Sequence, residues 1–478
     1  MTATIVQIFA LALSVSLVLG KFPAGFRFGA ATAAFQVEGA WLEDNKSPSV
    51  WDNLAHLPNY TADGRAPDIA GDSYHKYPED IKLMKDAGIK HYRFSISWPR
   101  IVPKGRAGEM LNFKAIEHYR TMLQALIAAG ITPYVTLYHW DLPAILAIQG
   151  YGLVDSYFTR DFVYYANASF TYFGDLVQYW FTFNEPWCMS ILNDFKKRDE
   201  STKPYKIAHN ALLAHAATVK LYREKYQQAQ GGFIGLVINS DMNYPKDPNK
   251  EADVAAAKRA LDFSLGWFAD PIFFGDYPAE MKKRVGDRLP QFTEEEKVLL
   301  KGSADFFALN HYSSSLCEDG EGGDDKNYWA DRNVKTSYKP EWKTTDMGWA
   351  IVPEGIRDLI TEINTRYLSE TKMPLYVTEN GMANKEPTAK EAKDDQPRID
   401  YLSAYLANVE SAIVDHGVNV QGYFVWSLID NFEWKEGFSK RFGIVRIEFT
   451  KDPERIPKAS YNWYKEFIKN NTEAITDY

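Results

Sequence analysis

The stretch YWFTFNEPW (residues 179–187) joins an aromatic run to a glutamate and a proline. Aromatic residues favour a buried β-strand, whereas proline cannot donate a hydrogen bond to a sheet and usually ends a strand. Glu185, between Asn184 and Pro186, is therefore expected at the end of a strand and at one edge of a sheet.

Similar apolar runs recur along the chain. With the first, they occupy residues 26–35, 91–97, 132–138, 179–183, 233–239, 306–310, 375–379 and 422–427. Most are nearly continuous in hydrophobicity, which is typical of parallel strands covered on both faces. Helical patterns lie between them, for example at 73–89, 113–131 and 209–228. Gly88 and Gly130 are expected to end the first two of these helices.

Eight strands that alternate with helices predict an α/β fold with a parallel sheet. At a length of 478 residues, the simplest arrangement is a single closed (β/α)8 TIM barrel with insertions. A doubly wound open sheet is the structural alternative, but no Gly-rich phosphate-binding turn follows the first run. No Pro/Gly/Ser-rich linker divides the sequence, so residues 21–478 are expected to form one domain.

Residues 1–20 carry no charged side chain, and their apolar run ends at Gly20, a small residue suited to cleavage. This pattern predicts a secretory signal peptide. A membrane anchor is the alternative, but the run is short for a membrane span and lacks a basic flank. We therefore expect a secreted, extracellular protein, for example in a gut lumen. Sequons predict exposed N-glycan sites at Asn45, which Pro48 makes a weaker candidate, and at Asn59, Asn167 and Asn470.

The net charge of −9 disfavours nucleic acid or an anionic membrane as a partner and favours a neutral small molecule. Two cysteines, Cys188 and Cys317, allow one disulfide at most, and two unpaired thiols are the favoured alternative. The nine histidines show no metal-binding spacing, so neither a metal nor another cofactor is expected. The sequence carries no signal for an oligomeric state.

Two acids end predicted strands on the same side of the expected barrel. Glu185 ends the fourth run and Glu379, in YVTENG, ends the seventh. The carboxyl ends of barrel strands meet at one mouth, where chemistry takes place. Paired carboxyl groups suit glycoside hydrolysis: one protonates the leaving oxygen, and the other is the nucleophile when the two stand about 5 Å apart. A single Glu at a strand end is as readily explained by an exposed acid or a salt-bridge partner as by a catalytic role. Two Glu residues at matched strand ends favour catalysis.

The chain resembles family 1 glycoside hydrolases, the β-glucosidase family, over nearly its whole mature length. The matching motifs are FRFGAATAAFQVEG (26–39), TFNEP (182–186), TENG (378–381) and WSLIDNFEWKEGFSKRFG (426–443). The resemblance implies a TIM barrel and a retaining β-glucosidase that hydrolyses terminal β-D-glucosyl residues from oligosaccharides or plant glucosides. We expect a secreted, animal- or insect-like member that digests or activates plant glucosides.

The resemblance also implies a role for each matching residue. Glu185 would be the acid/base with a raised pKa, and Glu379 would be the ionised nucleophile. Arg93 would lie beside Glu379, and Tyr312 would donate a hydrogen bond to it. Asn184 would hold the sugar 2-hydroxyl. The residues expected to hold the glucosyl ring are Gln36, His139, Asn184, Trp426 and Glu433, with Trp434 alongside.

Three of the neighbouring positions carry further expectations. Trp349 would form a platform for the aglycone, with a core tryptophan as the alternative. Trp140 is nearly as well explained by core packing, whereas His139 is expected to bind the sugar. An ionised Glu433 would repel a 6-phosphate, which favours an unphosphorylated sugar as the substrate.

The resemblance weakens after TFNEPW, where residues 188–210 replace a Gly-rich stretch and contain Lys196, Lys197 and Arg198. This triplet would approach the leaving group and could recognise an anionic aglycone such as a sulfated thioglucoside, although a solvated loop is the simpler interpretation.

Two other function classes stay open. A myrosinase-like thioglucosidase acting on glucosinolates is disfavoured by Glu185, because the plant thioglucosidases that resemble this family have glutamine there. A noncatalytic sugar-binding protein is disfavoured because both acids are present. The sequence does not choose among cellobiose, aryl glucosides, glucosinolates and galactosides.

Overall fold

Eight parallel strands close into a barrel in the computed structural model, which describes residues 22–148, 152–192, 201–323 and 325–472. β1 pairs with β2 on one side and with β11 on the other, which closes the ring and rules out the open sheet. Each predicted apolar run contributes one strand. The barrel strands are β1 (Arg27–Ala31), β2 (His91–Ser95), β3 (Thr132–Tyr138), β4 (Tyr179–Asn184), β5 (Phe233–Asn239), β7 (Phe307–Asn310), β10 (Leu375–Asn380) and β11 (Val420–Trp426).

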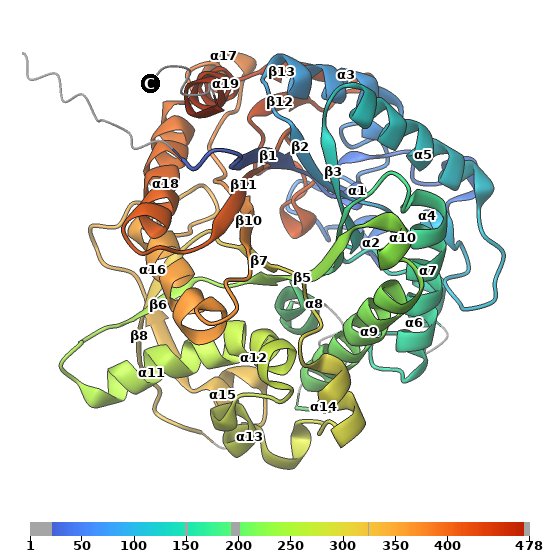
Figure 1. Cartoon of the computed structure of the whole chain (residues 1–478). Helices are drawn as coiled ribbons and strands as arrows, with labels where there is room; N and C mark the ends of the chain where they lie inside the picture. The colour runs from blue at the N-terminus through green and yellow to red at the C-terminus, as the bar shows by residue number, and fades with distance from the viewer. Residues whose placement is uncertain (1–21, 149–151, 193–200, 324, 473–478) are drawn as a thin grey trace, which may run out of the picture.

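Helices surround the barrel on its outside (Figure 1). The longer ones are α3 (Ser73–Asp86), α5 (Phe113–Ala128), α7 (Tyr157–Phe173), α9 (Lys203–Lys225), α11 (Glu251–Leu261), α12 (Trp267–Phe274), α16 (Glu354–Ile363), α18 (Gln396–Val414) and α19 (Ala459–Thr472). Gly88 and Gly130 follow α3 and α5 with φ angles of 71° and 76°. This left-handed conformation suits glycine and ends both helices as predicted.

Short helices lie in the connections. They are α1 (Ala34–Val37), α2 (Val50–Ala55), α4 (Trp98–Ile101), α6 (Ala144–Ile148), α8 (Pro186–Ile191), α10 (Gln227–Gln230), α13 (Ala279–Val285), α14 (Glu294–Leu300), α15 (Tyr328–Arg332) and α17 (Ala389–Ala392). The first predicted run, 26–35, is therefore too long as a strand. The amide of Ala34 donates to Ser95 Oγ at 2.7 Å, and this contact with the end of β2 turns the chain into α1.

The barrel interior is packed with side chains. Its apolar cluster includes the aromatic residues Tyr134, Phe181, Tyr376 and Phe424. The rings of Tyr134 and Phe424 have centroids 4.9 Å apart. A larger apolar cluster fills the layer between the strands and the helices. The barrel therefore has a solid centre, as is usual for this fold.

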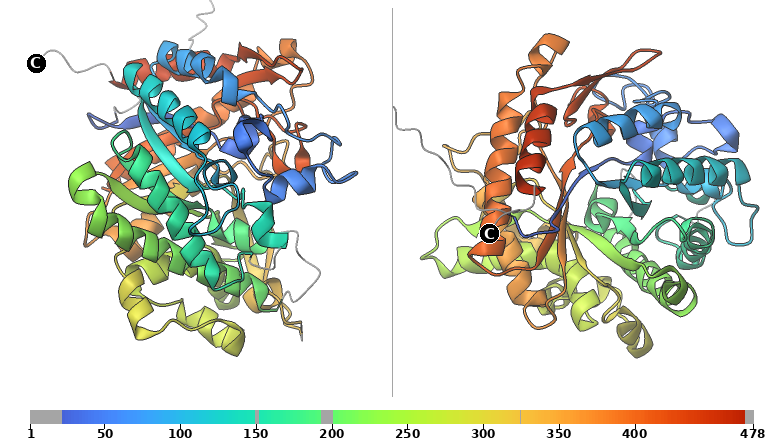
Figure 2. Two further views of the ribbon diagram at one scale, coloured as in Figure 1. Left: turned by 90° about the vertical axis from the view of Figure 1, so that its right-hand side faces the viewer. Right: turned by 45° about the horizontal axis from the view of Figure 1, so that its top comes forward.

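Two small sheets accompany the barrel. In the first, β8 (Ser314–Asp319) pairs parallel with β6 (Met242–Pro245) and antiparallel with β9 (Val334–Ser337). In the second, β12 (Val445–Glu448) and β13 (Glu454–Pro457) are antiparallel. Figure 2 shows the blue first strand, β1, beside the red-orange last barrel strand, β11.

Both cysteines are free thiols, as favoured from the sequence, with Cys317 buried and Cys188 half-buried. Within the described ranges, no helix is both long and apolar enough to cross a membrane.

Candidate active site

A cavity of about 640 Å³ opens where the barrel strands end. It collects side chains from segments far apart in the sequence. The predicted residues on its lining are Gln36, His139, Asn184, Glu185, Tyr312, Trp349, Glu379, Trp426, Glu433 and Trp434. Arg93, the remaining predicted residue, is completely buried and reaches Glu379 with its guanidinium. The structure therefore brings all the predicted catalytic and sugar-binding residues together.

The backbone is strained at three places around the cavity. Glu185 follows β4 with a φ of 49°, and Pro186 takes the first position of α8, where its missing N–H is not needed. Trp140 and Trp434 also have positive φ angles, of 75° and 50°. Positive φ is uncommon outside glycine and costs about 1–3 kcal/mol for each residue, so it persists where the surroundings enforce it. Here it aims three side chains at one cavity.

A chain of hydrogen bonds links the two carboxyl groups. Asn310 Nδ2 donates to Glu185 Oε1 at 2.7 Å and to Asn184 Oδ1 at 3.1 Å. Arg93 Nη2 donates to the same Asn184 oxygen at 2.7 Å, and Arg93 Nη1 forms an ion pair with Glu379. One continuous polar network thus fixes both acids relative to each other.

The two acids have different environments. Glu379 forms an ion pair with Arg93 and accepts a hydrogen bond from the hydroxyl of Tyr312 at 2.7 Å on its Oε2. Burial, and next the charge of Glu379, raise the pKa of Glu185 to about 7. Hydrogen bonds from Cys188, whose Sγ lies 3.0 Å from Glu185 Oε2, and from Asn310 oppose this rise. Such a difference is what separates a general acid from a nucleophile.

Asn310 is a site residue that the sequence patterns did not single out. Thr378 Oγ1 donates to Asn310 Oδ1 at 2.7 Å, which orients the amide so that Nδ2 faces Glu185. Its only signal in the sequence is that it ends the sixth apolar run, the same strand-end position that drew attention to Glu185 and Glu379.

The loop after β11 builds one side of the cavity. Gln36 Nε2 donates to Asn431 Oδ1 at 3.0 Å, to the Phe432 carbonyl at 2.9 Å and to Glu433 Oε2 at 3.4 Å. Burial, followed by the charges of Glu379 and Glu185, raises the pKa of Glu433 to about 8. Glu433 is therefore mostly protonated at neutral pH, and its expected repulsion of a 6-phosphate is weaker than an ionised carboxylate would give.

Aromatic rings flank the same side. The His139 ring lies nearly parallel to those of Trp426 and Trp434, with centroid distances of 5.9 Å and 6.1 Å. Burial, and then the charge of Arg93, hold the pKa of His139 well below its ordinary value, so the ring is neutral. Trp140 Nε1 donates to the Asn184 carbonyl at 2.8 Å, and its side chain both packs against the core and lines the cavity.

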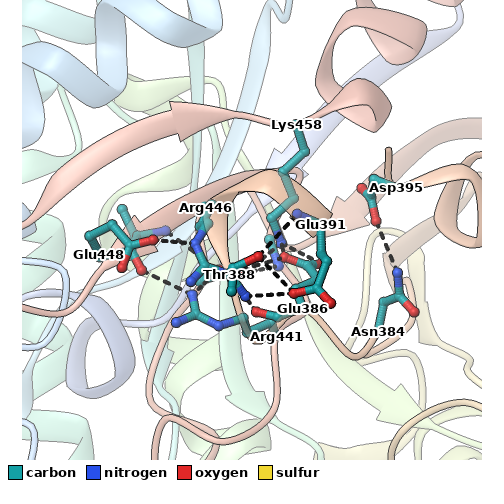
Figure 3. Close-up of polar contacts among 12 residues, drawn as sticks. Asn384, Glu386, Thr388, Glu391, Asp395, Arg441, Arg446, Glu448 and Lys458 are labelled. Atoms are coloured by element: carbon teal, nitrogen blue, oxygen red, sulfur yellow. Dashed lines mark hydrogen bonds and ion pairs between the residues drawn. The ribbon is translucent and has the colours of Figure 1, made fainter. Parts of the chain in front are cut away.

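A buried ion-pair network supports this loop (Figure 3). Lys458 Nζ lies 2.7 Å from Glu386 Oε2 and 2.9 Å from Asp430 Oδ1, and all three side chains are fully buried. Arg441 Nη1 binds the other Asp430 oxygen at 2.6 Å, and Arg398 pairs with Glu386. Because Asp430 immediately precedes Asn431 and Phe432, which hold Gln36, the network fixes the position of this loop.

These observations agree with a match to one family. Residues 18–473 match the description "Glycosyl hydrolase family 1". The chain belongs to glycosyl hydrolase family 1. Within this family, β-glucosidase 42 of Arabidopsis thaliana is 41% identical over 472 residues, which cover 95% of each chain. β-Glucosidase 1B of Phanerodontia chrysosporium is 41% identical over 92% of this chain and 84% of its own. The solved structure of an aphid myrosinase has a TM-score of 0.88 and 40% identity, covering 94% of this chain and 99% of its own.

The resemblance to family 1 and the TIM barrel are thus confirmed. The expectation of an animal- or insect-like member is not supported, because the β-glucosidases just described come from a plant and a fungus.

The predicted glycan sites lie outside the cavity. Asn45, Asn59 and Asn470 are exposed. Asn167 is half-buried in α7, and its Oδ1 accepts a hydrogen bond from Tyr226 at 2.8 Å, so the prediction of an exposed sequon at Asn167 is wrong.

The signal segment 1–20 and the basic triplet Lys196, Lys197 and Arg198 lie outside the described residues. In the part of this family 1 chain that the structure describes, no group of three or more His, Cys, Asp or Glu side chains is arranged to hold a metal ion.

Proposed function

We propose that the protein is a retaining β-glucosidase that hydrolyses terminal β-D-glucosyl residues of oligosaccharides or plant glucosides. The observation that carries the proposal is the hydrogen-bonded chain from Glu185 through Asn310, Asn184 and Arg93 to Glu379. It joins an acid with a pKa of about 7 to an arginine-paired carboxylate in one cavity. The two 41% identical β-glucosidases support the same substrate class.

In the first step of the proposed reaction, protonated Glu185 gives its proton to the glycosidic oxygen while Glu379 attacks the anomeric carbon. The aglycone leaves and the sugar stays bound to Glu379 through an ester bond. In the second step, ionised Glu185 removes a proton from water, which attacks the same carbon and releases Glu379. Two inversions give net retention, and a pKa near 7 lets Glu185 serve as the acid and then as the base.

The anomeric form of the first product tests this mechanism. Proton NMR of a β-glucoside during early hydrolysis should show the β-anomer of glucose before mutarotation produces the α-anomer. If the α-anomer appears first, the assignment of Glu379 as the nucleophile is refuted.

Hydrolysis of β-thioglucosides is a second candidate, favoured by the likeness to the aphid myrosinase. A panel of cellobiose, an aryl β-glucoside, an aryl β-galactoside and a sulfated thioglucoside separates the candidates. A β-glucosidase should have its highest kcat/KM on an O-glucoside, whereas a dedicated thioglucosidase should prefer the thioglucoside.

Secretion and glycosylation complete the proposal. The charge-free apolar segment 1–20 supports secretion with cleavage after Gly20, and the exposure of Asn59 supports a glycan at its sequon. Expression of the full chain in animal cells should release a protein that begins at Lys21 into the medium. Enzymatic removal of N-glycans should then lower its mass, and Asn59→Gln should reduce that difference. Retention of the uncleaved chain in membranes would contradict secretion.

A further inference from the structure

Tyr312 contacts the proposed nucleophile from the connection between β7 and β8, which is neither helix nor strand. Its hydroxyl donates to Glu379 Oε2 at 2.7 Å, while Arg93 pairs with Oε1 of the same carboxylate. The two contacts together hold the carboxylate in one orientation. Catalytic groups must be held within about 0.5 Å of their productive position, so the placement of the Tyr312 main chain matters for the reaction.

Two tyrosines of α18 hold the main chain of Tyr312. The Tyr401 hydroxyl donates to the Tyr312 carbonyl at 3.1 Å, and the Tyr405 hydroxyl donates to the same oxygen at 3.4 Å. The two tyrosines are four residues apart on one face of the helix, and their stacked rings have centroids 4.0 Å apart. Both side chains are buried, and α18 lies on the outside of the barrel (Figure 1). An outer helix therefore holds a residue that lines the cavity.

Tyr401 also contacts the strand that carries the nucleophile. Asn380 directly follows Glu379 at the end of β10. Its Nδ2 donates to the Tyr401 hydroxyl at 3.0 Å and to the His311 carbonyl at 2.7 Å. Tyr423 donates to Asn380 Oδ1 at 2.7 Å, which fixes the orientation of this amide. The Tyr401 hydroxyl thus accepts a hydrogen bond from β10 and donates one to the connection after β7.

The Tyr401 hydroxyl makes the shorter of the two hydrogen bonds to the Tyr312 carbonyl. Without it, the carbonyl would keep only the longer of these two contacts, from Tyr405. Asn380 Nδ2 would at the same time lose one of its acceptors. Both sides of the contact with the nucleophile would then be less restrained.

We infer that Tyr401 is a positioning residue for the proposed nucleophile. Its hydroxyl holds the Tyr312 main chain where the Tyr312 hydroxyl reaches Glu379 Oε2. The inference rests on the proposed retaining mechanism and adds to it a residue that does not line the cavity.

A double-mutant cycle with Tyr401→Phe and Tyr312→Phe tests this inference, because each change removes one hydroxyl and keeps the ring. The substrate is 2,4-dinitrophenyl β-glucoside, whose leaving group needs little protonation, so that kcat/KM reports attack by Glu379. In the wild-type background Tyr401→Phe should lower kcat/KM about three- to tenfold, as for loss of one hydrogen bond. In the Tyr312→Phe background the same change should alter kcat/KM by less than about twofold, since the hydroxyl that Tyr401 positions is already absent.

Tyr464→Phe is the matched control. Tyr464 is a buried tyrosine of α19, another outer helix, and its hydroxyl donates to the Gly29 carbonyl on β1 at 2.9 Å. Neither residue lines the cavity, so loss of this hydrogen bond should leave kcat/KM within about twofold. Tyr405→Phe is a second test variant. It removes the longer bond to the Tyr312 carbonyl and should show a smaller loss that again disappears in the Tyr312→Phe background.

Several outcomes would overturn the inference. Equal losses from Tyr401→Phe in both backgrounds would do so, because the Tyr401 hydroxyl would then act independently of Tyr312. An unchanged kcat/KM in Tyr401→Phe, or a loss that Tyr464→Phe matches together with a lower melting temperature, would also refute it. If Tyr401→Phe does not fold, Tyr405→Phe decides by the same comparison of backgrounds. In each case the wild type still hydrolyses the substrate with retention, whereas a wild type without activity on any β-glucoside refutes the proposed function itself.

Discussion

Replacement of Asn310 by alanine should shift the pH range in which the enzyme works. The change removes the hydrogen bond from Nδ2 to Glu185 Oε1, which is 2.7 Å long and favours the ionised carboxylate. A hydrogen bond to a charged group contributes about 1.5–3 kcal/mol, and one pKa unit corresponds to about 1.4 kcal/mol. Loss of the bond should therefore raise the pKa of Glu185 from about 7 by roughly one unit or more.

The pH dependence of kcat/KM measures this change, because its basic limb reports ionisation of the acid in the free enzyme. An alkyl β-glucoside is the best substrate, since its poor leaving group needs protonation. The basic limb of Asn310→Ala should move to higher pH, while kcat/KM at the optimum falls because Glu185 is less well oriented. Thr378→Val is the control, because it removes the hydrogen bond that Asn310 Oδ1 accepts but keeps Asn310 Nδ2. The basic limb of the pH profile of this variant should move less than that of Asn310→Ala. A basic limb that stays in place, or moves to lower pH, would refute the role of Asn310.

Three further predictions concern other parts of the site. Glu185→Gln should retain more activity on a 2,4-dinitrophenyl β-glucoside than on an alkyl glucoside, whereas Glu379→Gln should be inactive on both; equal losses would contradict the assigned roles. The raised pKa of Glu433, about 8 against an ordinary 4.5, implies a stabilisation that is present at low pH and lost as the pH rises toward 8. Glu433→Gln should therefore raise the melting temperature at pH 8 but not at pH 5, and an equal change at both pH values would be inconsistent with this. Lys458→Met should cost about 3–5 kcal/mol of unfolding free energy, because it leaves two buried carboxylates without the cation that joins them. Exposed Lys465→Met should change little in the same thermal unfolding experiment, and a similar small effect of Lys458→Met would contradict the supporting role of the network.

The barrel is predictable from the sequence because its strands are buried on both faces. All eight apolar runs form strands. A continuous apolar run can be recognised in the sequence without knowing which strands lie next to it. The end of the first run was not predictable. Ala34 enters a helix because Ser95, on another strand, accepts a hydrogen bond from its amide, and no local pattern signals that contact.

The candidate site also has a part that the sequence predicted and a part that it did not. Glu185 and Glu379 were found because each ends a strand, and the family motifs added the sugar-binding residues. Asn310 was missed although it also ends a strand, because an asparagine there is equally typical of a turn. The orientation of the Asn310 amide depends on Thr378, which lies on the neighbouring strand β10. Contacts of this kind depend on the assembled fold.

The position of Lys458 affects the order in which the enzyme matures. Chains emerge from the ribosome beginning at the N-terminus, so all eight barrel strands, the last of which ends at Trp426, are made before Lys458. Until then the carboxylates of Glu386 and Asp430 lack the ammonium group that bridges them. The loop that contains Asp430 therefore gains its complete set of ion pairs only after nearly the whole protein has been translated. A nascent chain with a complete set of barrel strands still lacks the cation that joins Glu386 to Asp430.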